Sequence, residues 1–292
     1  MDFEIRKDID ECKALWDSFS PNERLFDIWD YRSCFFDEKE HEPYFIVGYD
    51  KSGIEGFIPL VFNKKSNKYD YFGGWFAEKN GLYIKDKAKL KLFLEQCPDN
   101  TSIEGLNPTE RGNFGFLEDQ YSYYLDLSRY DYSLEKYFSS LNKKRQKNLR
   151  SEFKKIPEYK VHLNRIKDYK RFVELNIMRH NGQSQFNDKT VRKGFLKMVK
   201  LANEKGTLDM MSVEINNKVE AVDICVLFKN RYYALIGSSN CQKISNLGKL
   251  MVMLNIKNAI EKGAKYVEFG ATADHWKHMW EFDKDMLLKF VK

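Results

Sequence analysis

The chain has 292 residues, a net charge of +6, and 42% hydrophobic and 15% aromatic residues. This length suits one large domain or two of about 150 residues, and this composition excludes a disordered chain. No apolar run approaches the roughly 20 residues that a membrane-spanning helix needs, and the acidic, amphipathic N-terminus does not suit a secretory signal. The five cysteines form no CxxC pair, so we expect reduced thiols and a cytoplasmic protein.

The first half of the chain predicts helices, a hairpin and further strands. Residues 8–20 and 26–36 carry apolar and aromatic side chains at helical spacing. Two apolar runs, 44–50 and 56–62, flank a Lys-Ser-Gly turn and predict a β-hairpin. The elements expected next are strand 68–74, helix 85–96, strand 101–106 and strand 122–127.

A basic segment opens the second half. Residues 129–156 predict one amphipathic helix, which begins at polar capping candidates and ends before Pro157. The part from 133 to 155 contains eight Lys or Arg and two Glu, so its net charge of +6 equals that of the whole chain. Such a local excess is typical of a solvated surface helix or of a polyanion-binding helix. Arg145 falls on the apolar stripe, so it needs a partner or a ligand.

The remainder predicts a strand, two helices, a three-strand meander, a helix and two strands. Short turns at Asn216–Asn217 and Lys229–Asn230 make the meander strands antiparallel. A helix separates strand 231–237 from strand 265–271, so these two can lie parallel through a crossover. The expected elements are strand 159–166, helices 168–180 and 188–204, strands 207–215, 218–228 and 231–237, helix 247–263, and strands 265–271 and 286–291. The two halves repeat one order loosely and are expected to meet near residue 128.

The segment from Arg231 to Gly263 joins a strand end, a polar loop and a helix N-terminus. Free backbone N–H groups and the positive end of the helix dipole converge at such a start. Gly248 lets a ligand approach the backbone closely, and Lys249 adds a positive charge. This pattern predicts an anion site, with an ordinary βα connection as the alternative.

Four stretches form a familiar pattern: 56–62 with 70–76, 137–156, 245–263 and 266–280. Their order, over about residues 12–290, resembles the GNAT acyltransferase superfamily and its two-domain FemAB-like and CelD-type branch. The resemblance implies an α/β fold (α+β, with a mixed sheet) of two GNAT-like domains in tandem, residues 1–128 and 129–292. Each would be a mostly antiparallel twisted sheet flanked by helices. The first would be degenerate and on the acceptor side, and the second would bind the donor and catalyse.

The resemblance also implies an acyl-coenzyme A donor with its phosphates at Ser245–Lys249. The pantetheine arm would pair like an extra strand beside strand 231–237, in a gap opened against strand 265–271. The family commonly has Gln or Arg, two residues, Gly, one residue, then Gly or Ala in this loop, whereas Ser245 stands first and Leu250 last here. FemAB-like proteins that use aminoacyl-tRNA deviate there too, so the donor stays open between the two. The expected donor-binding residues are Gly237, Ser238, Ser239, Asn246, Leu247, Gly248, Lys249 and Arg145.

Acyl transfer to an amine needs an aligned nucleophile, a route for its proton and stabilisation of the oxyanion. Asp223 lies mid-strand among apolar residues, where burial should raise its pKa and suit it to accept that proton, unless it forms a structural ion pair. Glu268, across the gap, is a second candidate. Lys277 matches a lysine that the family places after this strand, which implies that it neutralises the oxyanion or a donor phosphate; a surface lysine is the alternative. His275 suits acid–base chemistry better than a metal site with His278, because no second ligand pair accompanies them.

Candidates for the acceptor side are Arg179 and His180, at the end of a predicted helix, and Tyr71 and Trp75 in the first half. A plain helix end and core aromatics are the alternatives. The sequence predicts a metal-free N-acyltransferase that moves an acyl group from acyl-coenzyme A to an amino sugar, amino acid or cell-envelope precursor by direct attack. The alternatives are an aminoacyl transferase that draws on aminoacyl-tRNA through the 133–155 basic helix, and a non-catalytic binding module. The oligomeric state stays open.

Overall fold

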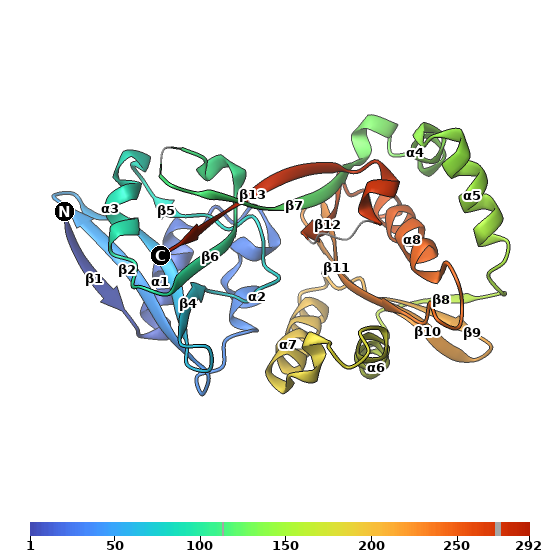
Figure 1. Ribbon diagram of the computed structural model, residues 1–292, viewed down its shortest axis with the longest axis horizontal. Coiled ribbons are helices and arrows are strands. Elements are labelled where there is room, and N and C mark those ends of the chain that lie inside the picture. The colour runs from blue at the N-terminus through green and yellow to red at the C-terminus, as the bar shows by residue number, and fades with distance from the viewer. Residues whose placement is uncertain (113, 272–275) are drawn as a thin grey trace. The chain divides into compact units, whose positions relative to one another are not determined.

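The computed structural model describes residues 1–112, 114–271 and 276–292, and the chain divides into two compact units (Figure 1). The first unit contains Met1–Ser122 and Asp285–Lys292, and the second contains Tyr123–Gly270 and the segment that ends at Lys284. The C-terminal residues therefore return to the first unit. The order of elements along the sequence, which assigned 129–292 to one domain, does not indicate this return.

The first unit has a mostly antiparallel sheet with strand order β1-β2-β3-β4-β6-β13, and β5 pairs with β3. Its elements are β1 (Asp2–Arg6), α1 (Ile9–Phe19), α2 (Trp29–Ser33), β2 (His41–Asp50), β3 (Gly53–Asn63), β4 (Lys68–Tyr71), β5 (Tyr83–Ile84), α3 (Leu90–Glu95), β6 (Thr101–Leu106), β7 (Leu117–Asp126) and the C-terminal part of β13 (Asp283–Val291). The predicted hairpin is confirmed as β2 and β3, which pair from His41–Asn63 to Asp50–Gly53. The predicted helix 26–36 is wrong in length, because only Trp29–Ser33 is α-helical.

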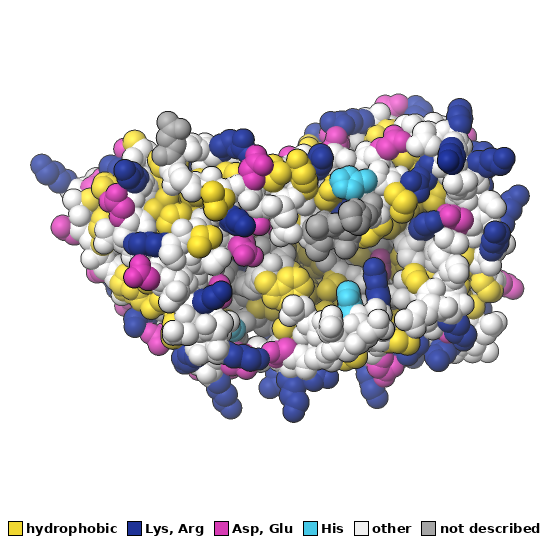
Figure 2. All heavy atoms as spheres, in the orientation of Figure 1, with side chains coloured by type: hydrophobic (Ala, Val, Ile, Leu, Met, Phe, Trp, Pro, Cys, Tyr) yellow, Lys and Arg dark blue, Asp and Glu magenta, His cyan; other side chains and the backbone are white. Residues whose placement is uncertain are grey.

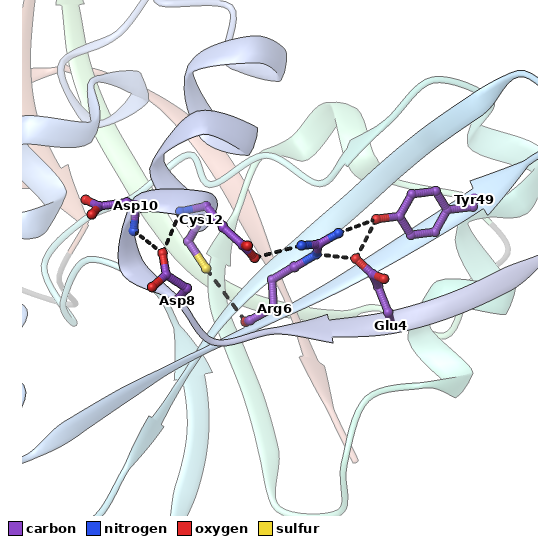
Figure 3. A network of polar contacts seen from close by, with 7 residues as sticks. Glu4, Arg6, Asp8, Asp10, Cys12 and Tyr49 are labelled. Atoms are coloured by element: carbon purple, nitrogen blue, oxygen red, sulfur yellow. Dashed lines mark hydrogen bonds and ion pairs between the residues drawn. The ribbon is translucent and has the colours of Figure 1, made fainter.

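Strand β1, which the sequence did not predict, joins the sheet and fixes the start of α1 (Figure 3). Its Arg6 side chain contacts Glu4, Tyr49 of β2 and Glu11 of α1. Asp8 caps α1 by accepting hydrogen bonds from the backbone N–H groups of Asp10 and Glu11, both at 3.0 Å. A short exposed strand carries little hydrophobic pattern, so side-chain contacts of this kind define it instead.

The second unit has the strand order β8-β9-β10-β11-β12-β7. Its further elements are α4 (Leu134–Ser140), α5 (Lys143–Phe153), β8 (Lys160–Leu163), α6 (Tyr169–Arg179), α7 (Lys189–Glu204), β9 (Met211–Ile215), β10 (Lys218–Phe228), β11 (Arg231–Ser239), α8 (Leu247–Glu261) and β12 (Tyr266–Ala271). The predicted antiparallel meander is confirmed as β9, β10 and β11, and the predicted parallel pair as β11 and β12. Figure 1 shows α6 and α7 on one face of this sheet and α8 on the other.

The single basic helix predicted over 129–156 is wrong, because the structure has two helices there. The chain leaves the helical conformation at Leu141, and Asn142 begins α5 by accepting a hydrogen bond from the backbone N–H of Arg145 at 2.9 Å. Asparagine favours such a capping position over a helix interior because its side chain competes for backbone donors. Leu141, at 1% exposure, packs into the core at the break.

Each unit has a hydrophobic core of its own. In the first unit the core gathers around stacked aromatic rings, among them Trp29 on Phe72 and Phe45 on Phe57. In the second, the inward faces of α8 and β10 meet: Cys225 packs with Val252 and Ile256. These contacts fix α8 against the sheet and so position the loop and helix start in front of it.

Candidate active site

Asp223 lies in the middle of β10 and faces α8, on the side of the strand predicted from the alternation of its neighbours. The amide Nδ2 of Asn255, on α8, donates a hydrogen bond to Asp223 Oδ2 at 2.7 Å. Across the sheet Asp223 is paired with Gly237 of β11. A Cβ atom at Gly237 would lie 2.2 Å from Asp223 Oδ1, so only glycine lets the carboxylate rest against β11 in this way.

Burial raises the pKa of Asp223 to about 6, although the hydrogen bond from Asn255 and the charge of Arg179 oppose the rise. The side chain is only half-buried and keeps some access to solvent. A carboxylate with a pKa near neutrality, and with access to exchange a proton, is suited to general base chemistry.

Strand β11 parts from β12 before it reaches Asp223, while it stays paired with β10. Ile224 pairs with Ile236 and Cys225 pairs with Ala234, so Leu235 is an extra residue, a β-bulge in β11. Parallel pairing with β12 covers only Arg231–Tyr233. In the described part of the chain, Ala234–Ser239 pairs with β10 and not with β12. The bulged end of β11 can therefore accept another extended chain along its backbone.

The loop after β11 leads directly into α8. Glu220 of β10 holds this loop, since it accepts hydrogen bonds from Asn240 Nδ2 at 2.9 Å and Lys243 Nζ at 3.1 Å. Asn246 enters the helix with a left-handed φ of 66°, and its side chain forms no capping hydrogen bond to the described residues. The first N–H groups of α8 are thus left for an external acceptor.

Gly248 and Lys249, in the first turn of α8, are half-buried. A Cβ atom at Gly248 would lie 3.5 Å from Ser239 Oγ and 3.6 Å from Cys241 Sγ, which is ordinary van der Waals contact, so a β-carbon fits at this turn. Lys249 Nζ donates to Glu152 Oε1 of α5 at 2.6 Å. Arg145, also of α5, donates from Nη1 to the Met279 sulfur at 3.2 Å. Both predicted donor-binding cations therefore have partners within the unit.

The structure places Lys277 and Glu268 in separate surroundings. Lys277 is 2% exposed, donates to the Gly270 carbonyl oxygen at 2.8 Å and lies 5.3 Å from the centre of the Tyr123 ring. It is therefore not the surface lysine that was the alternative. Glu268 is 4% exposed and forms an ion pair with Arg231. His275 lies outside the described residues.

The four residues predicted for the acceptor divide between the units. Arg179 and His180 are exposed at the end of α6, close to the predicted end of helix 168–180, and the two residues that follow, Asn181 and Gly182, have left-handed φ angles of 47° and 81°. Tyr71 belongs to the first unit, is 6% exposed and donates from its hydroxyl to the Gly81 carbonyl. Trp75 of the same unit is 56% exposed.

Sequence reasoning missed the polar residues on the inward face of α8. Asn255 and Asn258 are 2% and 7% exposed, and both contact groups on the sheet. Asn258 Nδ2 donates to the hydroxyl of Tyr232 at 3.2 Å and to the buried carboxylate of Asp209. The signal was present as two asparagines, three positions apart, in a helix segment that is apolar apart from Lys257.

Among the described residues, no cluster of three His, Cys, Asp or Glu side chains is arranged to hold a metal ion. Within the same residues, no helix has the length and hydropathy to span a membrane.

The comparisons with known proteins agree with this geometry. Residues 143–278, within the second unit, match the family model of the acetyltransferase (GNAT) domain. The search of curated proteins returned no match. The matched segment contains β10, β11, α8 and β12, and therefore the whole arrangement around Asp223. This segment is a GNAT domain, of the acyltransferase class.

Solved structures extend the similarity to the whole chain. FemX covers 100% of this chain and 98% of its own at 12% identity, with a TM-score of 0.60. L-PGS from Bacillus licheniformis covers 97% and 91% at 10% identity, with a TM-score of 0.60. A tandem GNAT protein from the clavulanic acid biosynthesis pathway covers 99% and 98% at 10% identity, with a TM-score of 0.57. The predicted fold of two GNAT-like domains in tandem is confirmed.

Proposed function

We propose that the protein transfers an acyl group from acyl-coenzyme A to the amine of a small cytoplasmic acceptor, such as an amino sugar, an amino acid or a cell-envelope precursor. One arrangement supports this proposal above the others. The end of β11, bulged and parted from β12, leads into the N-terminus of α8, and the carboxylate of Asp223 lies against the same strand. The donor and the proton acceptor would then occupy one unit.

The donor would bind along β11 and at the start of α8. The backbone of Gly237–Ser239 would pair with the amide-containing arm of the donor, as an added strand pairs with a sheet edge. The N–H groups of Leu247, Gly248 and Lys249 would bind a donor phosphate, because negative charge is stabilised at a helix N-terminus. Lys249 would exchange its contact with Glu152 for that phosphate.

Asp223 would act as the general base. It accepts the proton that the acceptor amine loses as the nitrogen attacks the thioester carbonyl carbon, and the thiol of the donor leaves with a proton of its own from solvent. Lys277 would stabilise negative charge that develops on the carbonyl oxygen. Arg179 and His180, exposed at the end of α6, would bind an anionic group of the acceptor.

Calorimetric titration with acetyl-coenzyme A, followed by a thiol-release assay on a panel of amines, tests the proposal. We expect binding in the micromolar range and acceptor-dependent release of thiol. A variant that tests the site is Gly248→Val, whose two methyl groups beyond Cβ would occupy space at the helix start and should weaken donor binding at least tenfold. Absence of both binding and release would leave a non-catalytic module as the better description.

A second donor, aminoacyl-tRNA, is favoured by the basic face of α5. Four cations at spacings of four, three and four residues lie on one side of this helix and line an open hollow of about 550 Å³. Its lining residues are Ser139, Lys143, Gln146, Lys147, Arg150, Ser151 and Lys154. Lys and Arg side chains gather over α4 and α5 at the right of Figure 2. Such a row of charges complements a phosphate backbone.

Binding of charged tRNA across a salt series distinguishes the donors. If tRNA is the donor, Lys147→Gln and Arg150→Gln should each reduce the slope of log K against log salt by about one. Lys197 is exposed on α7 and does not belong to this row of charges, so Lys197→Gln should leave the slope unchanged. A flat salt response, together with acetyl-coenzyme A binding, would exclude tRNA and favour the first proposal.

A further inference from the structure

Asn255 is a polar residue in a position where an apolar one would pack well. It is 2% exposed, on the face of α8 that meets the sheet, between the buried side chains of Val252 and Ile256. A buried amide requires hydrogen-bond partners, and an isosteric leucine would avoid that cost. Its retention therefore calls for a reason other than packing.

The contacts of Asn255 lead to Asp223 on one side and to β11 on the other. Its Nδ2 donates to Asp223 Oδ2 at 2.7 Å. Its Oδ1 lies 3.5 Å from the Tyr232 hydroxyl and 3.5 Å from the Cys225 sulfur, both of which are oriented as donors. Because an ionised carboxylate only accepts hydrogen bonds, Nδ2 is the amide atom directed at Asp223, and Oδ1 then faces the Tyr232 hydroxyl and the Cys225 thiol.

The same contact divides the two oxygens of Asp223. Oδ2 is held by Asn255, while Oδ1 lies against the backbone of Gly237, on the strand that would carry the donor. Among the described residues, Oδ1 receives no hydrogen bond. One oxygen is thus used for orientation, and the other keeps its lone pairs free on the β11 side.

We propose that Asn255 is a positioning residue for the general base: it orients Asp223 so that Oδ1 receives the proton of the acceptor amine. This inference rests on the proposed function. Asn255 itself touches no reacting atom. By stabilising the ionised carboxylate it also keeps the base deprotonated at neutral pH.

Other groups contribute to the charge state of Asp223. Arg179, at the end of α6, favours the carboxylate form, and Cys225, on β10 itself, is held as a thiol because burial and the charge of Asp223 raise its pKa. From β11 the titratable residue Tyr232 approaches through Asn255, and burial raises its pKa. Asp209 contacts Asn258 and Lys262 and has no contact with Asp223 among the described residues.

The test compares Asn255→Leu with Asn258→Leu, which removes a second buried amide one turn further along the same helix. Carbon-13 NMR of the carboxyl groups reports the pKa of Asp223 without any substrate. The acidic limb of kcat/KM against pH reports the ionisation that acyl transfer requires. We expect Asn255→Leu to move the NMR pKa of Asp223 and the acidic limb of kcat/KM to higher pH by about one unit. The same variant should lower kcat more than it changes KM. Asn258→Leu should keep both at their wild-type positions.

The outcomes separate this inference from the function on which it rests. If the NMR pKa stays at about 6 in Asn255→Leu, Asn255 does not hold Asp223 and the proposal is overturned. If the NMR pKa rises but the acidic limb does not, Asp223 is not the base and a catalytic role for Asn255 is excluded. If the wild-type protein transfers no acyl group, the proposed function fails, while the NMR titration still decides whether Asn255 orients the carboxylate. Asn255→Asp, which places a second acid beside Asp223, should shift the limb further than Asn255→Leu does.

Discussion

The two units repeat one order of elements and differ where the second carries its candidate site. Each has a strand, two helices, a three-strand meander, a helix and two further strands. The last strands are exchanged: Asp285–Val291 of β13 belongs to the first unit, and Tyr123–Asp126 of β7 to the second. The helix after the meander has 6 residues in the first unit and 15 in the second.

The two units differ in what surrounds one glycine of each meander. A Cβ atom at Gly56 in the first unit would lie 2.3 Å from the Tyr83 carbonyl oxygen, because β5 covers β3 there. At Gly237 in the second unit, the nearest atom is a carboxylate oxygen of Asp223. The close approach serves backbone packing in one unit and orients a titrating group in the other.

The largest expected effect on kcat comes from removing a carboxylate in the second unit, compared with removing one in the first. Asp223→Asn should lower kcat by roughly 10² to 10³, the contribution of a general base. Its control is Asp70→Asn in β4 of the first unit, another acid whose pKa burial raises, which should change kcat less than about twofold. Rates from the thiol-release assay decide the comparison, and equal losses in both variants would contradict an active site in the second unit alone.

The wild-type rate should rise with pH through about 6 and level off above, because only the ionised form of Asp223 accepts a proton. The raised pKa also costs stability. An unfolded aspartate ionises near 3.9, so the folded state loses stability relative to the unfolded state as pH rises from about 4 to 6. Asp223→Asn should therefore gain about 1 to 3 kcal/mol in urea unfolding at pH 7.5 and lose that advantage below pH 4.

A further prediction compares Gly237 of the second unit with Gly56 of the first. Gly237→Ala should push the Asp223 carboxylate aside and lower kcat/KM by about 10- to 100-fold, with a small change in unfolding free energy, because a side chain can move. Gly56→Ala meets a backbone carbonyl and should cost about 1 to 3 kcal/mol of stability while folded protein retains its kcat/KM. Urea unfolding and kinetics on the same samples test the pair, and a reversed pattern would refute the assignment of roles.

Local patterns in the sequence account for most of the fold and for part of the site. Asn216 and Asn217 both adopt positive φ, as a two-residue hairpin turn requires, and that turn was predictable. The side on which Asp223 lies, and the direction of its pKa shift, followed from alternation in a buried strand. Pairings that bridge distant segments did not follow: Asn255 with Asp223, Lys249 with Glu152, and β13 with β6. The break at Asn142 was missed because amphipathic spacing continues across it.

A further prediction concerns the lysine beside the start of one helix in each unit, Lys249 at α8 and Lys89 at α3. Lys249→Ala should raise KM for acyl-coenzyme A about three- to tenfold and leave kcat nearly unchanged, because a phosphate contact that is present throughout the reaction contributes uniform binding. Lys89, which precedes α3 in the first unit, pairs with Asp50 at 2.9 Å and Glu55 at 2.8 Å. Lys89→Ala should lower the urea midpoint and leave KM unchanged. An equal KM for Lys249→Ala and wild type would remove Lys249 from the donor site.

The smallest expected effect concerns a helix cap in each unit, which should contribute to stability and not to activity. Asp8 caps α1 of the first unit, and Asp188 caps α7 of the second by accepting from the Thr190 backbone N–H at 2.7 Å. Each alanine variant leaves a helix N–H without its acceptor and should cost about 1 kcal/mol. Because neither residue is among the proposed site residues, kcat/KM should stay at the wild-type value in both variants. A loss of activity in Asp188→Ala that exceeds its loss of stability would show that α7 has a role in acceptor binding that the comparison of the two units does not capture.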